Sequence, residues 1–72
     1  MNLIDAIYTY HVEILHTDSQ EWTHIHHPDW ETSDSYADTF AYARTVLADH
    51  PTSQVRLVEA LEGHPDHHVD VR

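Results

Sequence analysis

The first clear pattern in the chain is a strict alternation of apolar and polar residues over Ala6–Leu15. Its apolar members are Tyr8, Tyr10, Val12 and Ile14, and its polar members are Thr9, His11 and Glu13. A period of two with β-branched and aromatic residues predicts a strand with one buried face. Residues 16–20 are turn-forming, and an extended pattern resumes at Glu21 and runs to His27. We therefore expect a β-hairpin.

The facing of this second strand is ambiguous. Either Trp22, His24 and His26 or Thr23 and Ile25 point toward the core, and we expect Trp22 to point inward near the turn. Pro28 ends the strand because it lacks the N–H donor that a ladder needs. A polar connector, residues 29–35, follows.

An amphipathic helix follows the connector. Four residues, Thr32, Ser33, Asp34 and Ser35, all qualify as its N-cap. Ser35 and Asp38, three residues apart, approximate a capping box, and Pro51 marks the end of the helix. Apolar residues recur at three- and four-residue spacing and predict about four turns. The predicted apolar side is Tyr36, Ala37, Phe40, Ala41, Ala43, Leu47 and Ala48, and the predicted polar side is Asp38, Thr39, Thr45 and Asp49.

Two further extended segments complete the chain. One runs from Val55 to Leu61 and the other from His67 to Arg72, with a turn signal at Gly63 between them. The order ββαββ predicts an α+β fold, a single small domain over residues 1–72, with the helix on one face of a small antiparallel sheet. The expected core is Tyr8, Tyr10, Val12, Ile14, Phe40, Leu47, Val55, Leu57, Val69 and Val71.

The opposite face of the sheet is expected to be uncovered and polar. It should carry Thr9, His11, Glu13, Arg56 and some histidines of the second strand, with Trp30 and Tyr42 nearby. Such a surface is either an interface or a solvated face with ordinary cross-strand pairs.

The small size of the domain limits its stability. A chain of 72 residues buries only about 60% of the surface that it exposes when unfolded. Cysteine is absent, so no disulfide supports the fold, and we expect a homodimer or a metal bound by histidine and carboxylate to help. No apolar run approaches the roughly 18 residues of a membrane span, and we expect a cytoplasmic protein with no membrane partner.

Acidic residues dominate the charge. Thirteen Asp and Glu stand against three Arg and no Lys, which gives a formal net charge of −10. Two interpretations stay open: the composition of a GC-rich or salt-adapted host, or a basic partner. Direct binding to nucleic acid is disfavoured because so few cations cannot offset repulsion from phosphates.

Nine histidines include two clusters. In the first, His24 and His26 lie two apart on a predicted strand, so they share a face and could hold Zn²⁺ or Ni²⁺ with either Asp29 or the second cluster. The second cluster, residues 64–68, lies in the last turn. The alternative is that these histidines are simply solvated.

No catalytic or cofactor motif is present, and Gly63 is the only glycine, which excludes a glycine-rich phosphate loop. We therefore expect a small non-enzymatic interaction module, an adaptor or a phage-type inhibitor, that binds a basic protein surface. The alternative is a histidine-based metal-binding or metal-sensing domain. The residues expected to contact a partner are Asp18, Glu21, Asp29, Trp30, Glu31 and Asp34.

Overall fold

The computed structural model describes residues 8–71. Four strands and one helix follow one another in the order ββαββ: β1 (Tyr8–His16), β2 (Glu21–Ile25), α1 (Tyr36–Asp49), β3 (Gln54–Leu61) and β4 (His67–Asp70). This confirms the predicted α+β fold. Ala6, Ile7 and Arg72, which the sequence assigned to the first and last strands, lie outside the described residues.

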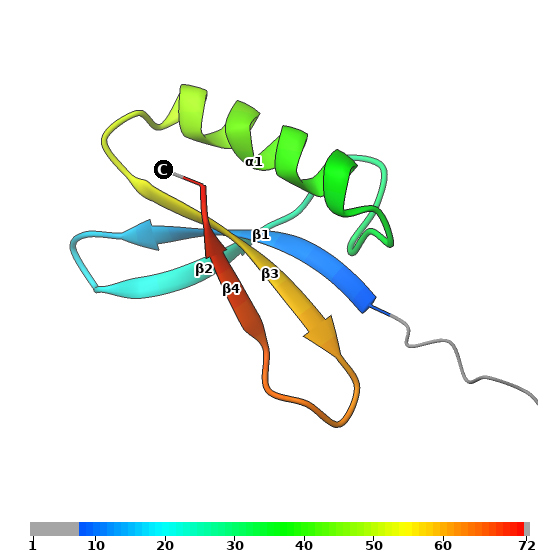
Figure 1. The fold of residues 1–72 in the computed structure, drawn as a ribbon. Helices are drawn as coiled ribbons and strands as arrows, with labels where there is room; N and C mark the ends of the chain where they lie inside the picture. Colours follow the sequence, from blue (N-terminus) through cyan, green and yellow to red (C-terminus); the bar gives the residue numbers. More distant parts are fainter. Residues whose placement is uncertain (1–7, 72) are drawn as a thin grey trace, which may run out of the picture.

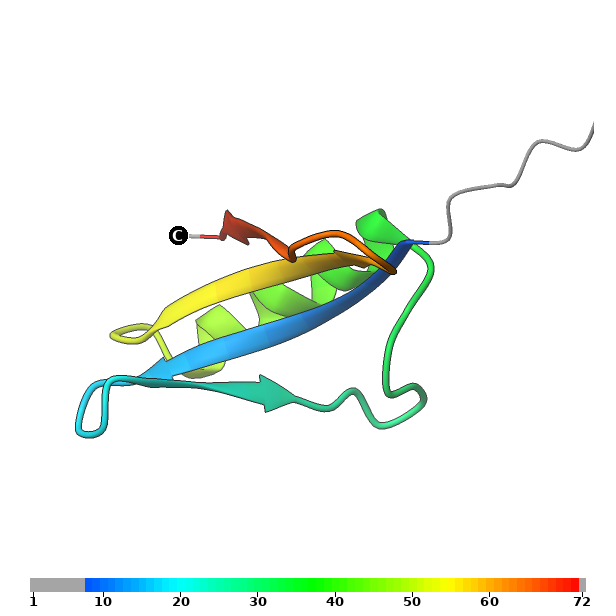
Figure 2. The same cartoon turned by 90° about the horizontal axis from the view of Figure 1, so that it is seen from below.

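All neighbouring strands are antiparallel, and the spatial order in the sheet is β2-β1-β3-β4. The two long strands, β1 and β3, form the centre of the sheet, and β2 and β4 are its short edges (Figure 1). Helix α1 lies across one face of β1 and β3 (Figure 1). Figure 2 looks onto the other face, which the helix does not cover.

The core lies between α1 and the two central strands. Its fully buried members are Val12, Ile14, Ala43, Val46, Val55 and Leu57. In the register of β1 and β3, Val12 lies opposite Leu57 and Ile14 opposite Val55, so these side chains share the helix-facing side. Phe40, Leu47, Val69 and Val71, also expected in the core, are only half-buried at its edge.

Two expectations about the helix-facing side are wrong. Tyr8 is 39% exposed, because α1 does not extend over that end of β1. Thr39, expected on the polar side of the helix, is fully buried. Its hydroxyl donates to the Ser35 carbonyl at 2.8 Å, so its polar atom is satisfied within the helix and the side chain packs like an apolar one.

The facing expected for β2 is also wrong. Val12 lies opposite Ile25 and Ile14 opposite Thr23, so Ile25 and Thr23 lie on the helix-facing side. Ile25 packs against the core. Trp22 lies opposite Leu15 and points to the uncovered face, together with His24. The strand also ends at Ile25, two residues earlier than expected.

Candidate functional site

The uncovered face carries a polar row that crosses all four strands. Glu13 on β1 lies opposite His24 on β2 and Arg56 on β3, and Arg56 lies opposite Asp70 on β4. The sequence placed Glu13 and Arg56 on this face, and the strand register agrees with that prediction.

Arg56 is fixed on two sides. Its Nε donates to Glu13 Oε1 at 2.8 Å, and its Nη2 lies 2.6 Å from the same oxygen. The guanidinium carbon lies 3.9 Å from the centre of the Trp22 ring, which is cation–π geometry. Burial of the Glu13 carboxyl favours its neutral form, but the hydrogen bonds from His11 and Arg56 outweigh burial and lower its pKa.

Three imidazoles form a stack beside this ion pair, which we call the histidine stack (His11, His24 and His26). The ring centroids of His11 and His24 are 4.3 Å apart, and those of His24 and His26 are 4.2 Å apart. His11 Nε2 lies 2.9 Å from Glu13 Oε2, and His24 Nε2 lies 3.2 Å from the Glu31 carbonyl oxygen. Burial, followed by the charges of His11 and His26, lowers the pKa of His24.

The histidine stack differs from the metal site expected from the sequence. His24 and His26 do lie together, but their third neighbour is His11 rather than Asp29. The Asp29 side chain is exposed in the connector and makes no hydrogen bond or ion pair with either imidazole. Within residues 8–71, no group of three or more histidine or carboxylate side chains is already arranged to hold a metal ion.

The second histidine cluster lies elsewhere: His64 is in the turn between β3 and β4, and His67 and His68 are the first residues of β4. Its histidines are exposed, and His67 Nδ1 lies 3.8 Å from Glu59 Oε1. Because His67 is exposed and this distance is long, the interaction with Glu59 contributes little to holding the His67 side chain.

A different set of side chains fixes the connector between β2 and α1. The rings of His27 and Trp30 stack with centroids 4.3 Å apart and an interplanar angle of 3°. Tyr42 of α1 meets both rings edge to face, and its hydroxyl donates to the His26 carbonyl at 3.2 Å. Trp30 and Tyr42, expected near the uncovered face, therefore anchor the connector to the helix instead.

The backbone of the connector is held as well. Ser33 exchanges two hydrogen bonds with Tyr10 of β1, at 2.7 and 2.9 Å, along the part of β1 that β2 does not reach. Ser35 is the N-cap of α1, and its hydroxyl accepts from the Asp38 N–H at 3.1 Å. Of the four N-cap candidates in the sequence, Ser35 is thus the cap, and the connector is an ordered segment between two fixed ends.

Two hollows flank Trp30 along this connector. One is lined by His27, Trp30, Asp38, Ala41, Tyr42 and Thr45, and the other by Thr9, Trp30, Thr32, Ser33, Asp34 and Asp38. Trp30 and Asp38 line both hollows, so each combines an aromatic ring with a carboxylate. Neither Asp34 nor Asp38 makes an ion pair within the described part of the chain.

The acidic residues expected to contact a partner divide into two groups. Asp29, Glu31 and Asp34 are exposed on the connector near these hollows. Asp18 lies in the hairpin turn and Glu21 is the first residue of β2, at the end of that strand away from the connector. Figure 2 shows the hairpin turn and the connector at opposite ends of β2. A strand of five residues spans roughly 15 Å. We call Asp29, Glu31, Asp34 and Asp38 the acidic connector set.

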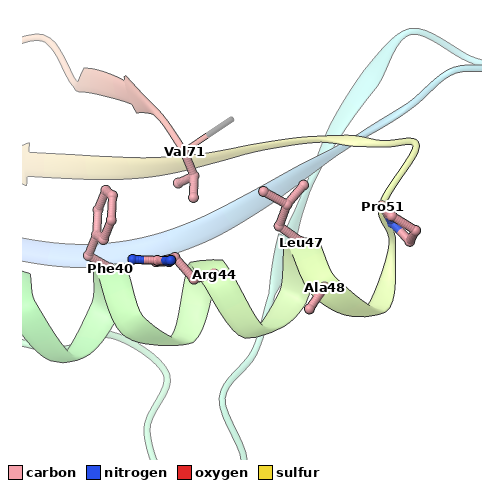
Figure 3. A pocket seen from close by; sticks show the side chains of 6 residues that line it. All are labelled: Phe40, Arg44, Leu47, Ala48, Pro51 and Val71. Carbon is pink, nitrogen blue, oxygen red and sulfur yellow. The ribbon is translucent and has the colours of Figure 1, made fainter.

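A third hollow lies on the other side of α1, between the helix and the residue that follows β4. Phe40, Leu47 and Val71 point into it, and Arg44, Ala48 and Pro51 complete its lining (Figure 3). It is mostly apolar, with one guanidinium at its side.

Aromatic rings are also exposed where α1 begins. Tyr8, Tyr10, Tyr36 and Phe40 form a chain of ring contacts with centroids 5.6 to 6.4 Å apart. Tyr8 and Tyr36 are the exposed large hydrophobic residues of the described chain, at 39% and 42%. We call this the aromatic patch (Tyr8, Tyr36 and Phe40).

Comparisons with protein-family models, with curated proteins and with solved structures found no match to this chain. The only helix over residues 8–71, α1, is too short and too polar to cross a membrane.

Proposed function

We propose that this protein is a non-enzymatic interaction module that binds a basic protein surface through its connector. The observation that carries the proposal is the pair of hollows beside Trp30, each lined by an aromatic ring and by Asp38. A guanidinium or ammonium group is attracted both by a carboxylate and by the face of an aromatic ring. An arginine or lysine of the partner would therefore occupy these hollows, with Asp29, Glu31 and Asp34 around them.

The order of the connector supports this proposal. The stacking of His27 on Trp30, the Tyr42 hydroxyl and the two Ser33 hydrogen bonds hold the segment before any partner arrives. A surface that is ordered in advance loses less conformational entropy on binding. The net charge of −10 would in addition accelerate the encounter with a cationic partner.

An adaptor or an inhibitor would use such a surface in the same way. Either would place its carboxylates over a basic region of the target and exclude that region's usual ligand. In both cases the expected target is a protein with a basic surface.

We also propose that the protein is a homodimer that buries the aromatic patch. Tyrosine and phenylalanine are enriched at interfaces, and a domain of this size gains stability from association. Tyr8 and Tyr36 expose more of their side chains than the other large hydrophobic residues of the described chain.

The experiment for the connector compares two triple variants with equal charge. Asp29→Asn, Asp34→Asn and Asp38→Asn neutralise the connector, whereas Asp49→Asn, Glu62→Gln and Asp66→Asn remove three carboxylates from other exposed positions. Binding of a short arginine-rich peptide is measured by fluorescence anisotropy at about 0.15 M salt, where charges more than about 8 Å apart are largely screened.

We expect the connector variant to bind at least about tenfold more weakly, since the loss of a central contact costs about 2 kcal/mol. The control variant should bind nearly as well as the wild type. Equal weakening in both variants would mean that only bulk charge acts, as an acidic host composition would predict, and would overturn the proposal. Trp30→Ala should also weaken binding without any change of charge, because it removes the ring that lines both hollows and that anchors the connector.

A further inference from the structure

We propose that the histidine stack is a binding site for one divalent transition metal ion, Zn²⁺ or Cu²⁺, with His11, His24 and His26 as ligands. This inference does not rest on the proposed function: the three imidazoles belong to the uncovered face of the sheet, and their contact with the connector is the hydrogen bond from His24 to the backbone carbonyl of Glu31.

The backbone places the three imidazoles suitably. His24 and His26 are two apart on β2 and its extension, so they project to the same side of the sheet. His11 comes from the adjacent strand and contacts His24 at a centroid distance of 4.3 Å. Two histidines from one strand and a third from its neighbour give three ligands on one surface, and imidazole suits Zn²⁺ and Cu²⁺.

The second and stronger observation is the hydrogen bonding of the far ring nitrogens. A histidine that ligates a metal usually donates its other N–H to a carboxylate or a backbone carbonyl. His11 Nε2 lies 2.9 Å from Glu13 Oε2, and His24 Nε2 lies 3.2 Å from the Glu31 carbonyl oxygen. In both rings Nδ1 is thereby left as the nitrogen for a metal.

Glu13 is itself held in place for this role. Arg56 binds Oε1, so Oε2 stays directed at His11, and the guanidinium rests on the Trp22 ring. A carboxylate that accepts a hydrogen bond from a ligating imidazole in this way orients the ring and fixes its tautomer.

Metal binding requires the rings to turn. With bonds of about 2.0 Å from zinc to nitrogen, tetrahedral imidazoles have ring centroids roughly 5 Å apart, and they present their edges to the ion. The stacked rings are closer than this, at 4.2 and 4.3 Å, and within the described residues they do not yet form a group that could hold an ion. His26 is exposed, and His11 and His24 are half-buried. We expect the rings to turn about their side-chain bonds, so that the stack opens around the ion.

The test is isothermal titration calorimetry with ZnCl₂ and, separately, CuCl₂ at pH 7.5. The triple variant His11→Asn, His24→Asn and His26→Asn is compared with the control His64→Asn, His67→Asn and His68→Asn, which removes the same number of imidazoles from the last turn. We expect one equivalent to bind to the wild type and to the control, and binding to be lost in the stack variant. Glu13→Gln should weaken binding by about tenfold or more through the orientation of His11.

Imidazole ring nitrogen shifts in NMR spectra of the wild type give a readout that needs no variant. One equivalent of Zn²⁺ should shift the Nδ1 signals of His11 and His24. Absence of binding to the wild type would overturn the proposal. So would binding that survives in the stack variant and disappears in the control, because the ion would then occupy the last turn.

Discussion

Arg56 and Glu13 lie directly opposite each other on the two central strands and are joined by a hydrogen bond of 2.8 Å from Nε to Oε1. Both side chains are 18% exposed, so water screens this pair less than it screens the exposed carboxylates of residues 8–71. The pair lies at the centre of the uncovered face and fixes the side chains around it.

We predict that Arg56→Ala lowers the free energy of unfolding by about 1 to 2 kcal/mol, because Glu13 would remain half-buried without its cation. Urea unfolding at pH 7.5 measures this change. The matched control is Arg44→Ala, which also removes one guanidinium but from an exposed position on the helix, and should change stability by less than about 0.5 kcal/mol. Equal effects of the two substitutions would show that the pair with Glu13 contributes nothing.

The pH dependence of stability should follow from the pKa of His24. That pKa is lowered in the folded protein from its ordinary value of 6.5, so the folded state favours the neutral ring. The contribution of the neutral His24 ring to the free energy of unfolding is therefore fully present above pH 6.5. It is lost as the pH falls through the lower pKa that His24 has in the folded state. The lowered pKa of Glu13 acts with the same sign below its ordinary value of 4.5.

We predict that urea unfolding midpoints, measured with EDTA between pH 7.5 and 5, fall as the pH decreases. The decrease in the midpoint should be smaller in His24→Asn than in the wild type. In His64→Asn, a substitution in the exposed last turn, the decrease should equal that of the wild type. A wild-type midpoint that is constant over this range would contradict the interpretation of the stack.

The sequence predicted the elements well because their patterns are strong. The alternation in β1 and the cap at Ser35 each specify local structure without help from distant residues. The facing of Trp22 could not be derived in this way, since both faces of β2 carry apolar side chains. What decides it is Arg56, 34 positions away, whose guanidinium rests on the Trp22 ring.

The site was harder to predict for the same reason. That His11 joins His24 depends on the pairing register of β1 and β2, and a shift of one residue would send each side chain to the opposite face. The burial of Thr39 was missed because a threonine in a helix can satisfy its own hydroxyl, here on the Ser35 carbonyl. Asp29, Trp30, Glu31 and Asp34 could be grouped from sequence because they are neighbours in the chain.

The cap at Ser35 offers a test of the order of the connector. Ser35→Ala removes the acceptor for the Asp38 N–H and should cost about 1 kcal/mol of stability. Ser19→Ala, in the exposed hairpin turn, should change stability by less than about 0.5 kcal/mol. Urea unfolding distinguishes the two, and no loss in Ser35→Ala would mean that the cap does not hold the start of the helix.

The aromatic patch leads to a prediction about association. Sedimentation equilibrium over a range of concentrations should show a dimer for the wild type and a weaker one for the double variant Tyr8→Ser, Tyr36→Ser. Removal of two rings from an interface costs binding energy. It should cost the folded monomer less than removal of a core ring would, because Tyr8 and Tyr36 are already 39% and 42% exposed. A wild type that stays monomeric throughout would exclude this interface.

The most direct test of the connector as a binding surface is a map of the amide shifts that an arginine-rich peptide causes in the ¹⁵N NMR spectrum of the wild type. We predict that the largest shifts fall between His27 and Tyr42, around the two hollows beside Trp30. Shifts centred instead on the hairpin turn at Asp18 or on the last turn at Asp66, or small shifts spread over all acidic positions, would contradict the account.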